Sequence, residues 1–84
     1  MYQVVVERSA EKDLKRLASD VRPRIVKVLQ SLAETPRPSG SLKLSGTAND
    51  WHIRVGDYRI IYEIADEIRI VRIHKIRPRG DAYR

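Results

Sequence analysis

Residues 51–64, which read WHIRVGDYRIIYEI, decide the fold because they predict two strands joined by a tight turn. β-branched and aromatic residues, which are typical of strands, recur on both sides of Gly56-Asp57. Glycine at this position can take the positive φ that short hairpin turns require. The stretch therefore predicts a β-hairpin.

The two predicted strands have one apolar face and one basic face, since side chains alternate between faces with a period of two. The apolar face carries Trp51, Ile53, Val55, Ile60, Tyr62 and Ile64. The opposite face carries His52 and Arg54 from the first strand and Arg59 from the second. If the apolar face packs on a core, these three nitrogen-bearing side chains lie together on the exposed face. We interpret them as a phosphate-binding site.

Upstream of the hairpin, the sequence predicts a strand and two helices. Residues 2–6 (YQVVV) are β-branched and predict a strand of the same sheet. A helix is expected over residues 10–18 with Ser9 as its N-cap, and a second from Asp20, as cap, to about residue 34, with Pro23 in its first turn. Apolar residues recur at helical spacing at Ala10, Leu14, Leu17 and Val21, and again at Ile25, Val28, Leu29 and Leu32. These stripes predict a helical hairpin.

Downstream of the helices, residues 35–41 (TPRPSGS) predict a loop, and Leu42 to Leu44 a brief extended stretch. Residues 68–74 predict a last strand whose alternation slips between Ile70 and Val71, so we expect a bulge or a strand covered on both faces. The order is strand, helical hairpin, then a three-strand antiparallel meander. It predicts one α+β domain over residues 1–84, with both helices on one face of a small sheet.

The composition excludes several classes of protein. A chain of 84 residues with 42% hydrophobic residues builds one small domain. No apolar run approaches the roughly 18 residues of a membrane span, and no secretory signal is visible, so we expect a cytoplasmic protein without a membrane partner. There is no cysteine, which excludes disulfides and thiolate metal sites, and His52 and His74 are the only histidines. We expect no cofactor.

The charge balance favours a polyanionic partner. Seventeen Lys and Arg residues against eleven Asp and Glu residues give a net charge of +6. Such a surface suits RNA or DNA, or an acidic protein that covers it. The excess is concentrated in residues 67–84, which hold six basic and two acidic residues.

The order of elements and the stretches RVGDYRIIYEI (54–64) and IHKIRPRGDAYR (73–84) resemble the RelE/ParE superfamily of bacterial and archaeal toxin–antitoxin toxins. The resemblance covers essentially the whole chain and implies a RelE-like fold. It leaves the activity open, because the RelE branch cleaves mRNA in the ribosomal A site, whereas the ParE branch poisons DNA gyrase and lacks the RNase residues. A non-catalytic RNA- or protein-binding module of the same fold is a third reading.

The RelE resemblance implies a set of catalytic residues. RelE-like enzymes carry two basic residues, often lysines, at alternate positions before the turn, where this chain has His52 and Arg54. The arginine that contacts the scissile phosphate matches Arg59, and an arginine six residues before a tyrosine matches Arg77 and Tyr83. The other basic residues expected to attract RNA are Lys43, Arg72, His74, Lys75 and Arg79. The implied partners are the ribosome, mRNA and a RelB-like antitoxin.

The chemistry of RNA self-cleavage fits these residue types. The 2′-hydroxyl must lose its proton, the phosphorane must be stabilised and the leaving 5′-oxygen must be neutralised, none of which requires a metal. Arginine suits the non-bridging oxygens and cannot serve as a base, whereas His52, with an ordinary pKa of about 6.5, can. Each residue also has a purely structural reading: Arg59 as a surface arginine paired with Glu63 or Asp57, Arg77 as a charge in a flexible tail, and His52 as a solvent-facing strand residue.

Overall fold

The computed structural model describes residues 1–78, and the predicted hairpin forms the centre of their sheet. The elements, in chain order, are β1 (Gln3–Val6), α1 (Arg8–Arg16), α2 (Arg22–Ser31), β2 (Leu42–Lys43), β3 (Asp50–Val55), β4 (Tyr58–Ala65) and β5 (Ile70–Pro78). β3 and β4 are joined by the two residues Gly56 and Asp57, and Gly56 has a φ of 59°. The turn predicted from the sequence is therefore present.

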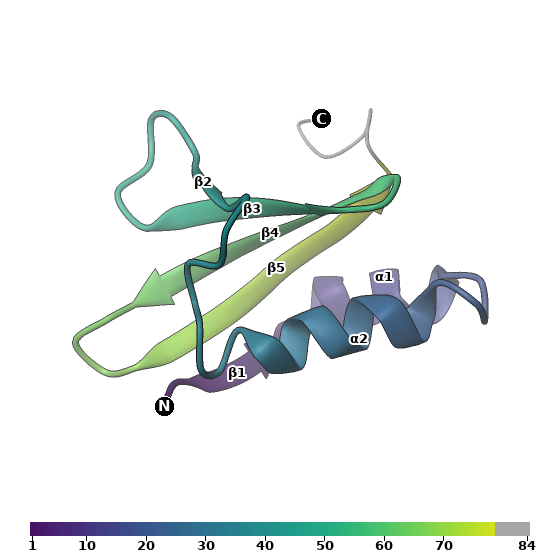
Figure 1. Cartoon of the computed structure of the whole chain (residues 1–84), viewed down its shortest axis with the longest axis horizontal. Helices are drawn as coiled ribbons and strands as arrows, with labels where there is room; N and C mark the ends of the chain where they lie inside the picture. The colour runs from purple at the N-terminus through teal and green to yellow at the C-terminus, as the bar shows by residue number, and fades with distance from the viewer. Residues whose placement is uncertain (79–84) are drawn as a thin grey trace.

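The strands form one sheet in the order β1-β5-β4-β3-β2. β1 is parallel to β5, and the other neighbouring strands are antiparallel, so β3, β4 and β5 make the predicted meander. Both helices lie on the same side of the strands (Figure 1). The predicted α+β fold is confirmed. No helix in residues 1–78 is long and apolar enough to cross a membrane.

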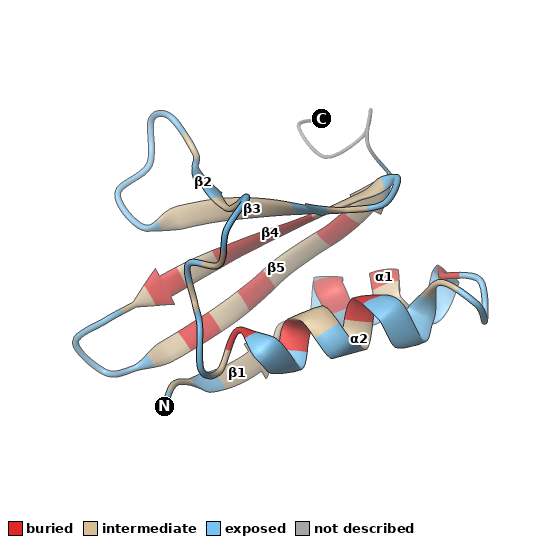
Figure 2. Ribbon diagram, in the orientation of Figure 1, coloured by how far each residue is buried: buried red, intermediate tan, exposed pale blue. Residues whose placement is uncertain are grey.

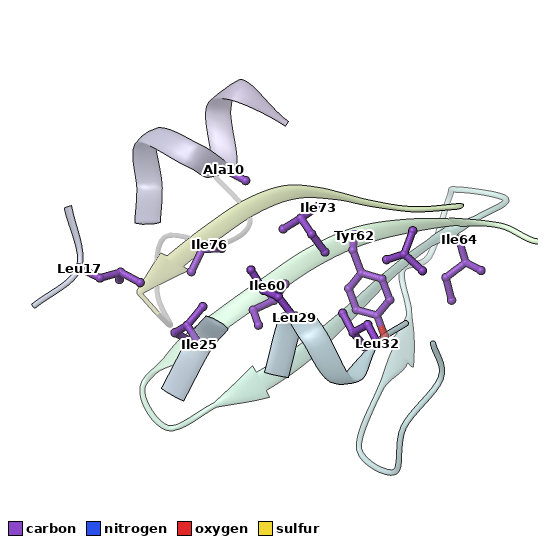
Figure 3. Close-up of a cluster of buried hydrophobic side chains, with 11 residues drawn as sticks. Ala10, Leu17, Ile25, Leu29, Leu32, Ile60, Tyr62, Ile64, Ile73 and Ile76 are labelled. Carbon is purple, nitrogen blue, oxygen red and sulfur yellow. The ribbon is translucent and has the colours of Figure 1, made fainter. Parts of the chain in front are cut away.

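The core lies between the helices and the sheet face that the hairpin was expected to bury. Figure 2 shows buried positions along β4 and β5 and on both helices. The buried side chains are Ala10, Leu17, Ile25, Leu29, Leu32, Ile60, Tyr62, Ile64, Val71, Ile73 and Ile76, most of which Figure 3 labels. Both helical stripes contribute, as their spacing predicted. Trp51, Ile53 and Val55 pack against this cluster and are partly buried.

Replacing Leu29 with alanine is expected to lower the free energy of unfolding by about 2–5 kcal/mol, because buried methyl groups are lost and a cavity remains. Leu29 is 4% exposed and lies on the side of α2 that faces the strands (Figure 3). Denaturant titration measures the loss. Lys27→Ala, on an exposed position of the same helix, serves as the control and should change stability by less than about 0.5 kcal/mol. A loss below about 1 kcal/mol for Leu29→Ala would contradict its place in the core.

Both predicted helix N-caps are wrong. α1 begins at Arg8 instead of residue 10, with Glu7 as its N-cap. The Ser9 hydroxyl donates instead to the carbonyl of His74 at 2.7 Å. The N-cap of α2 is Val21 rather than Asp20, without a side-chain cap, and the helix ends at Ser31 rather than near residue 34. Pro23 does lie in the first turn. The Ser9 hydroxyl is engaged by β5, a long-range contact that local capping rules do not register.

The last strand is displaced from its predicted range of 68–74. Residues 66–69 form a turn in which Arg69 has a φ of 55°, and Ile68 is 58% exposed instead of lying in a strand. β5 then continues to Pro78, because β4 pairs with it along its whole length. Arg77 therefore lies in a strand, and its reading as a charge in a flexible tail is wrong.

The last strand has a bulge, but it lies at His74 and not between Ile70 and Val71, where β5 pairs regularly with β4. Ile61 pairs with Lys75 while Tyr62 pairs with Ile73, so His74 has no directly opposite residue on β4. The extra residue changes the alternation of β5, which lets Ile73 and Ile76 both face the core. The bulge thus sets which β5 side chains reach the opposite face.

The loop from residue 35 to residue 41 is held on the sheet by Arg37. Its guanidinium donates to both carboxylate oxygens of Asp66, at 3.2 and 2.7 Å, and lies 5.1 Å from the centre of the Trp51 ring. The hydroxyl of Tyr2 donates to the same carboxylate at 2.5 Å. These hydrogen bonds, first from Arg37 and then from Tyr2, lower the pKa of Asp66 to about 2. These contacts of Arg37 hold the loop against the end of the sheet that lies away from the β3–β4 turn.

Candidate functional site

Three arginines lie in one row across the sheet face opposite the core, which we call the outer face. Arg54 of β3 is directly opposite Arg59 of β4, and Arg59 is directly opposite Arg77 of β5. We call these residues the arginine row. Directly opposite side chains have Cβ atoms roughly 4.5–5.5 Å apart, and like charges at that spacing are destabilising. An anion bound between the guanidinium groups would offset this repulsion.

His52 lies in the next row, with Ile61 and Lys75. Its imidazole is partly buried, and the pKa of His52 is lowered below 6.5, first by this burial and second by the positive charge of Arg59. Both effects disfavour the imidazolium form. At neutral pH the ring is therefore mostly neutral, which is the form that accepts a proton.

The outer arginines of the row are oriented by hydrogen bonds from their Nε atoms. Arg54 Nε donates to the carbonyl of Gly56 at 3.1 Å. Arg77 Nε donates to Asp13 Oδ2 at 3.1 Å, and the backbone N–H of Ile76 donates to the same oxygen at 2.9 Å. Asp13 is 5% exposed, whereas the side chain of Arg77 is 35% exposed. One end of the row is thus tied to the turn and the other to α1.

A cluster with carboxylates occupies the outer face beyond the His52 row. Arg72 Nη1 lies 3.2 Å from Glu63 Oε1, so Glu63, one candidate partner for Arg59, contacts Arg72. His74 Nδ1 bonds to Glu7, and His74 Nε2 lies 3.7 Å from Asp50 Oδ1 and 4.0 Å from Glu63 Oε1. We call Glu7, Asp50, Glu63, Arg72 and His74 the mixed-charge cluster. Among residues 1–78, no group of three or more His, Asp or Glu side chains is arranged to hold a metal ion.

The structure brings together some of the predicted site residues and separates others. His52, Arg54, Arg59 and Arg77 share one region of the outer face, with Lys75 beside them. Lys43 is opposite Trp51 in β2–β3 pairing and so projects to the other face. Arg72 and His74 contact carboxylates, and their RNA-binding role stays a prediction. The remaining predicted residues, Arg79 and Tyr83, lie outside the described residues.

Sequence reasoning missed two residues near the row. Asp13 was not singled out from the sequence, although it lies on the buried stripe, three residues after Ala10 and four before Leu17. A carboxylate on a buried stripe needs a partner, and that was the available signal. The other residue is Arg24 of α2, whose Nη2 lies 3.4 Å from where a Cβ at Gly56 would sit. Nothing in the sequence pattern links Arg24 of the helix with Gly56 of the turn.

The comparisons with known proteins all give toxins of toxin–antitoxin systems. The family model for the ParE toxin of the type II toxin–antitoxin system parDE matches residues 4–83. The archaeal RelE–RelB complex from Pyrococcus horikoshii OT3 contains a chain with a TM-score of 0.84 and 30% identity, covering 96% of this chain and 98% of that one.

Two bacterial structures are similar to the same extent. A chain of the intact RelBE toxin–antitoxin complex of E. coli has a TM-score of 0.80 and 28% identity, covering 93% of this chain and 96% of that one. A chain of the RelBE2 toxin–antitoxin complex of Mycobacterium tuberculosis has a TM-score of 0.82 and 28% identity, with 93% and 98% covered. With the family model matching nearly all of its length, the chain belongs to the RelE/ParE superfamily of type II toxin–antitoxin toxins.

Proposed function

We propose that this toxin is a ribosome-dependent mRNA endoribonuclease of the RelE type, acting in the cytoplasm on the codon in the A site. The observation that carries the proposal is the arginine row beside a histidine of lowered pKa. A phosphate group matches the positive charge of the row, because guanidinium groups bind its oxygens with paired N–H donors. The neutral imidazole supplies a base next to it.

The proposed reaction begins when neutral His52 takes the proton of the 2′-hydroxyl. The 2′-oxygen then attacks the adjacent phosphorus, forming a pentavalent phosphorane whose non-bridging oxygens carry extra negative charge. Arg59, at the centre of the row, stabilises these oxygens, and Arg54 and Arg77 hold the phosphate from either side. The bond from phosphorus to the 5′-oxygen breaks, and that oxygen gains a proton from water. The products are a 2′,3′-cyclic phosphate and a 5′-hydroxyl.

The mixed-charge cluster limits where RNA lies on the outer face. Its three carboxylates, from Glu7, Asp50 and Glu63, repel phosphates, whereas the arginine row and Lys75 attract them. The backbone of the mRNA therefore passes over the end of the sheet nearest the β3–β4 turn. With few catalytic groups in that region, the ribosome supplies the in-line alignment of the 2′-oxygen with the leaving oxygen.

The second candidate is a ParE-like poison of DNA gyrase without nuclease activity, which the description of the matching family model favours. The two readings differ in their target. The test adds purified protein to ribosomes programmed with a defined mRNA and, separately, to a gyrase supercoiling reaction. We expect cleavage of the ribosome-bound mRNA and unchanged supercoiling. Inhibited gyrase with intact mRNA would assign the chain to the ParE-like class.

We further propose that a RelB-like antitoxin neutralises the protein, as the toxin–antitoxin complexes of the similar structures suggest. A surface with a net charge of +6 attracts an acidic segment, and a segment covering the arginine row excludes mRNA from it. Cleavage of ribosome-bound mRNA should therefore fall as antitoxin is titrated to saturation. Full cleavage by the saturated complex would contradict neutralisation at this site.

A further inference from the structure

We propose that Asp13 is a positioning residue, which holds the guanidinium of Arg77 in the arginine row. The proposal rests on the nuclease function proposed above. Asp13 is a buried carboxylate on α1, and its Oδ2 accepts hydrogen bonds from Arg77 Nε and from the N–H of Ile76. It is therefore the link between the helix layer and the row.

The site of this link follows from the topology of the sheet edge. β1 pairs with β5 only from Ile70 to Ile73, so the edge of β5 beyond that point has no strand beside it among residues 1–78. Side chains of α1 take its place: the Ser9 hydroxyl donates to the carbonyl of His74, and Asp13 accepts from the N–H of Ile76. α1 thereby covers backbone groups that a longer β1 would have paired.

A role limited to this edge would leave the second hydrogen bond of Asp13 unexplained. Backbone pairing of Ile76 needs one acceptor, which an uncharged asparagine or serine supplies equally well. A carboxylate is the acceptor that also carries a negative charge, and Arg77 Nε lies 3.1 Å from it. Because burying a carboxylate is unfavourable without a cation and hydrogen bonds, Asp13 and Arg77 depend on each other.

The position of Arg77 explains the role of the negative charge on Asp13. Arg77 is directly opposite Arg59, so the two guanidinium groups repel one another in the free protein. A long, half-exposed arginine without an anchor would turn away from the row into solvent. Asp13 counters this by holding the Nε side of the guanidinium group, and the two Nη groups are left to bind the phosphate. The positioned group then reaches the phosphate without a search through rotamers.

The first test compares Asp13→Asn with the wild type in single-turnover cleavage on ribosomes. Asparagine keeps the size and an acceptor for Ile76 but loses the charge. We expect the rate to fall by about 10- to 100-fold, because displacing a catalytic group by about 1 Å can cost that much. The ribosome concentration at half-maximal rate should change far less. Asp66→Asn, which removes the same charge from an exposed carboxylate paired with Arg37 away from the row, is the control and should cleave at the wild-type rate.

Combining substitutions separates positioning from general loss of structure. In an Arg77→Ala background, Asp13→Asn should cause no further loss of rate, because its effect passes through Arg77. Two independent losses that multiply, or a well-folded Asp13→Asn protein that cleaves like the wild type, would overturn the proposal.

A spectroscopic measurement tests the positioning even if the nuclease function is wrong. The Arg77 Nε–H resonance, identified by its absence in Arg77→Lys, should be observable in the free wild-type protein by ¹⁵N NMR, since a hydrogen-bonded Nε–H exchanges slowly with water. We expect Asp13→Asn to remove it by fast exchange. An unchanged signal in Asp13→Asn overturns the positioning role, whereas wild-type protein with this signal but no mRNA cleavage overturns only the proposed function.

Discussion

Replacing Arg59 with alanine is expected to slow single-turnover cleavage of ribosome-bound mRNA by roughly 10²–10³-fold, or about 2.7–4 kcal/mol of transition-state stabilisation. Arg59 is at the centre of the arginine row, with an arginine directly opposite on each side. Its interaction with the phosphate strengthens as charge develops on the non-bridging oxygens, so the loss falls on the rate. Single-turnover kinetics at saturating ribosomes measure it.

Affinity for the ribosome should change much less in Arg59→Ala, because one phosphate contact is a small part of an interface that involves many charges. Arg8→Ala is the control, since it removes the same charge from an exposed position at the start of α1, outside the row. Its rate should stay near that of the wild type. Equal rates for Arg59→Ala and Arg8→Ala would show that the row does not act on the reacting phosphate.

Replacing His52 with glutamine is expected to lower the cleavage rate by about 10²–10⁴-fold, the usual contribution of a general base. In the wild type the rate should rise with pH and level off below neutrality. The rate rises with pH because a histidine acts as a base only in its neutral form. It levels off below neutrality because the pKa of His52 is lowered below 6.5 by burial and by Arg59. The rate profile between pH 5 and 8 measures both effects.

Two further profiles identify the group that titrates. The residual activity of Arg59→Ala should show its inflection at higher pH, since removing the positive charge relieves one cause of the lowered pKa of His52. His74→Gln removes the other histidine and should keep the pH-dependent rise. A flat wild-type profile, with His52→Gln as active as the wild type, would leave His52 as an ordinary strand residue.

The sequence was sufficient for the features that depend on local periodicity. The stripe containing Ile25 and Leu29 and the alternation of Ile60 and Tyr62 place their residues in the core because a helix and a strand have fixed periods. A two-residue turn also fixes the hairpin register, so the sequence alone was enough to place Arg54 and Arg59 on one face.

The rest of the site depends on contacts between distant segments. Arg77 reaches the row only because the bulge at His74 sets the register of β5, and a slip of one residue would direct its side chain toward the helices. The Asp13–Arg77 hydrogen bond joins residues 64 positions apart, and the carboxylates around His74 come from three different segments. No local pattern encodes such pairs.

The helix ends fail for the same reason. Arg22 donates to the carbonyls of Leu14, Lys15 and Leu17 and so closes the C-terminal end of α1, a contact between the two helices. Propensity and capping rules consider only neighbouring residues, whereas here a side chain from the next helix satisfies the orphan carbonyls. The predicted Ser9 N-cap is wrong for a similar reason, because the Ser9 hydroxyl donates to the carbonyl of His74 on β5.

The central claim, that the arginine row and His52 promote attack by the 2′-oxygen, is tested most directly by the chemistry of the cut ends. Ribosomes programmed with a defined mRNA are incubated with the purified protein, and the fragments are analysed by mass spectrometry. We expect cleavage within the A-site codon, with a 2′,3′-cyclic phosphate on the upstream fragment and a 5′-hydroxyl on the downstream one. Intact mRNA, or fragments with a 3′-hydroxyl and a 5′-phosphate, would contradict it.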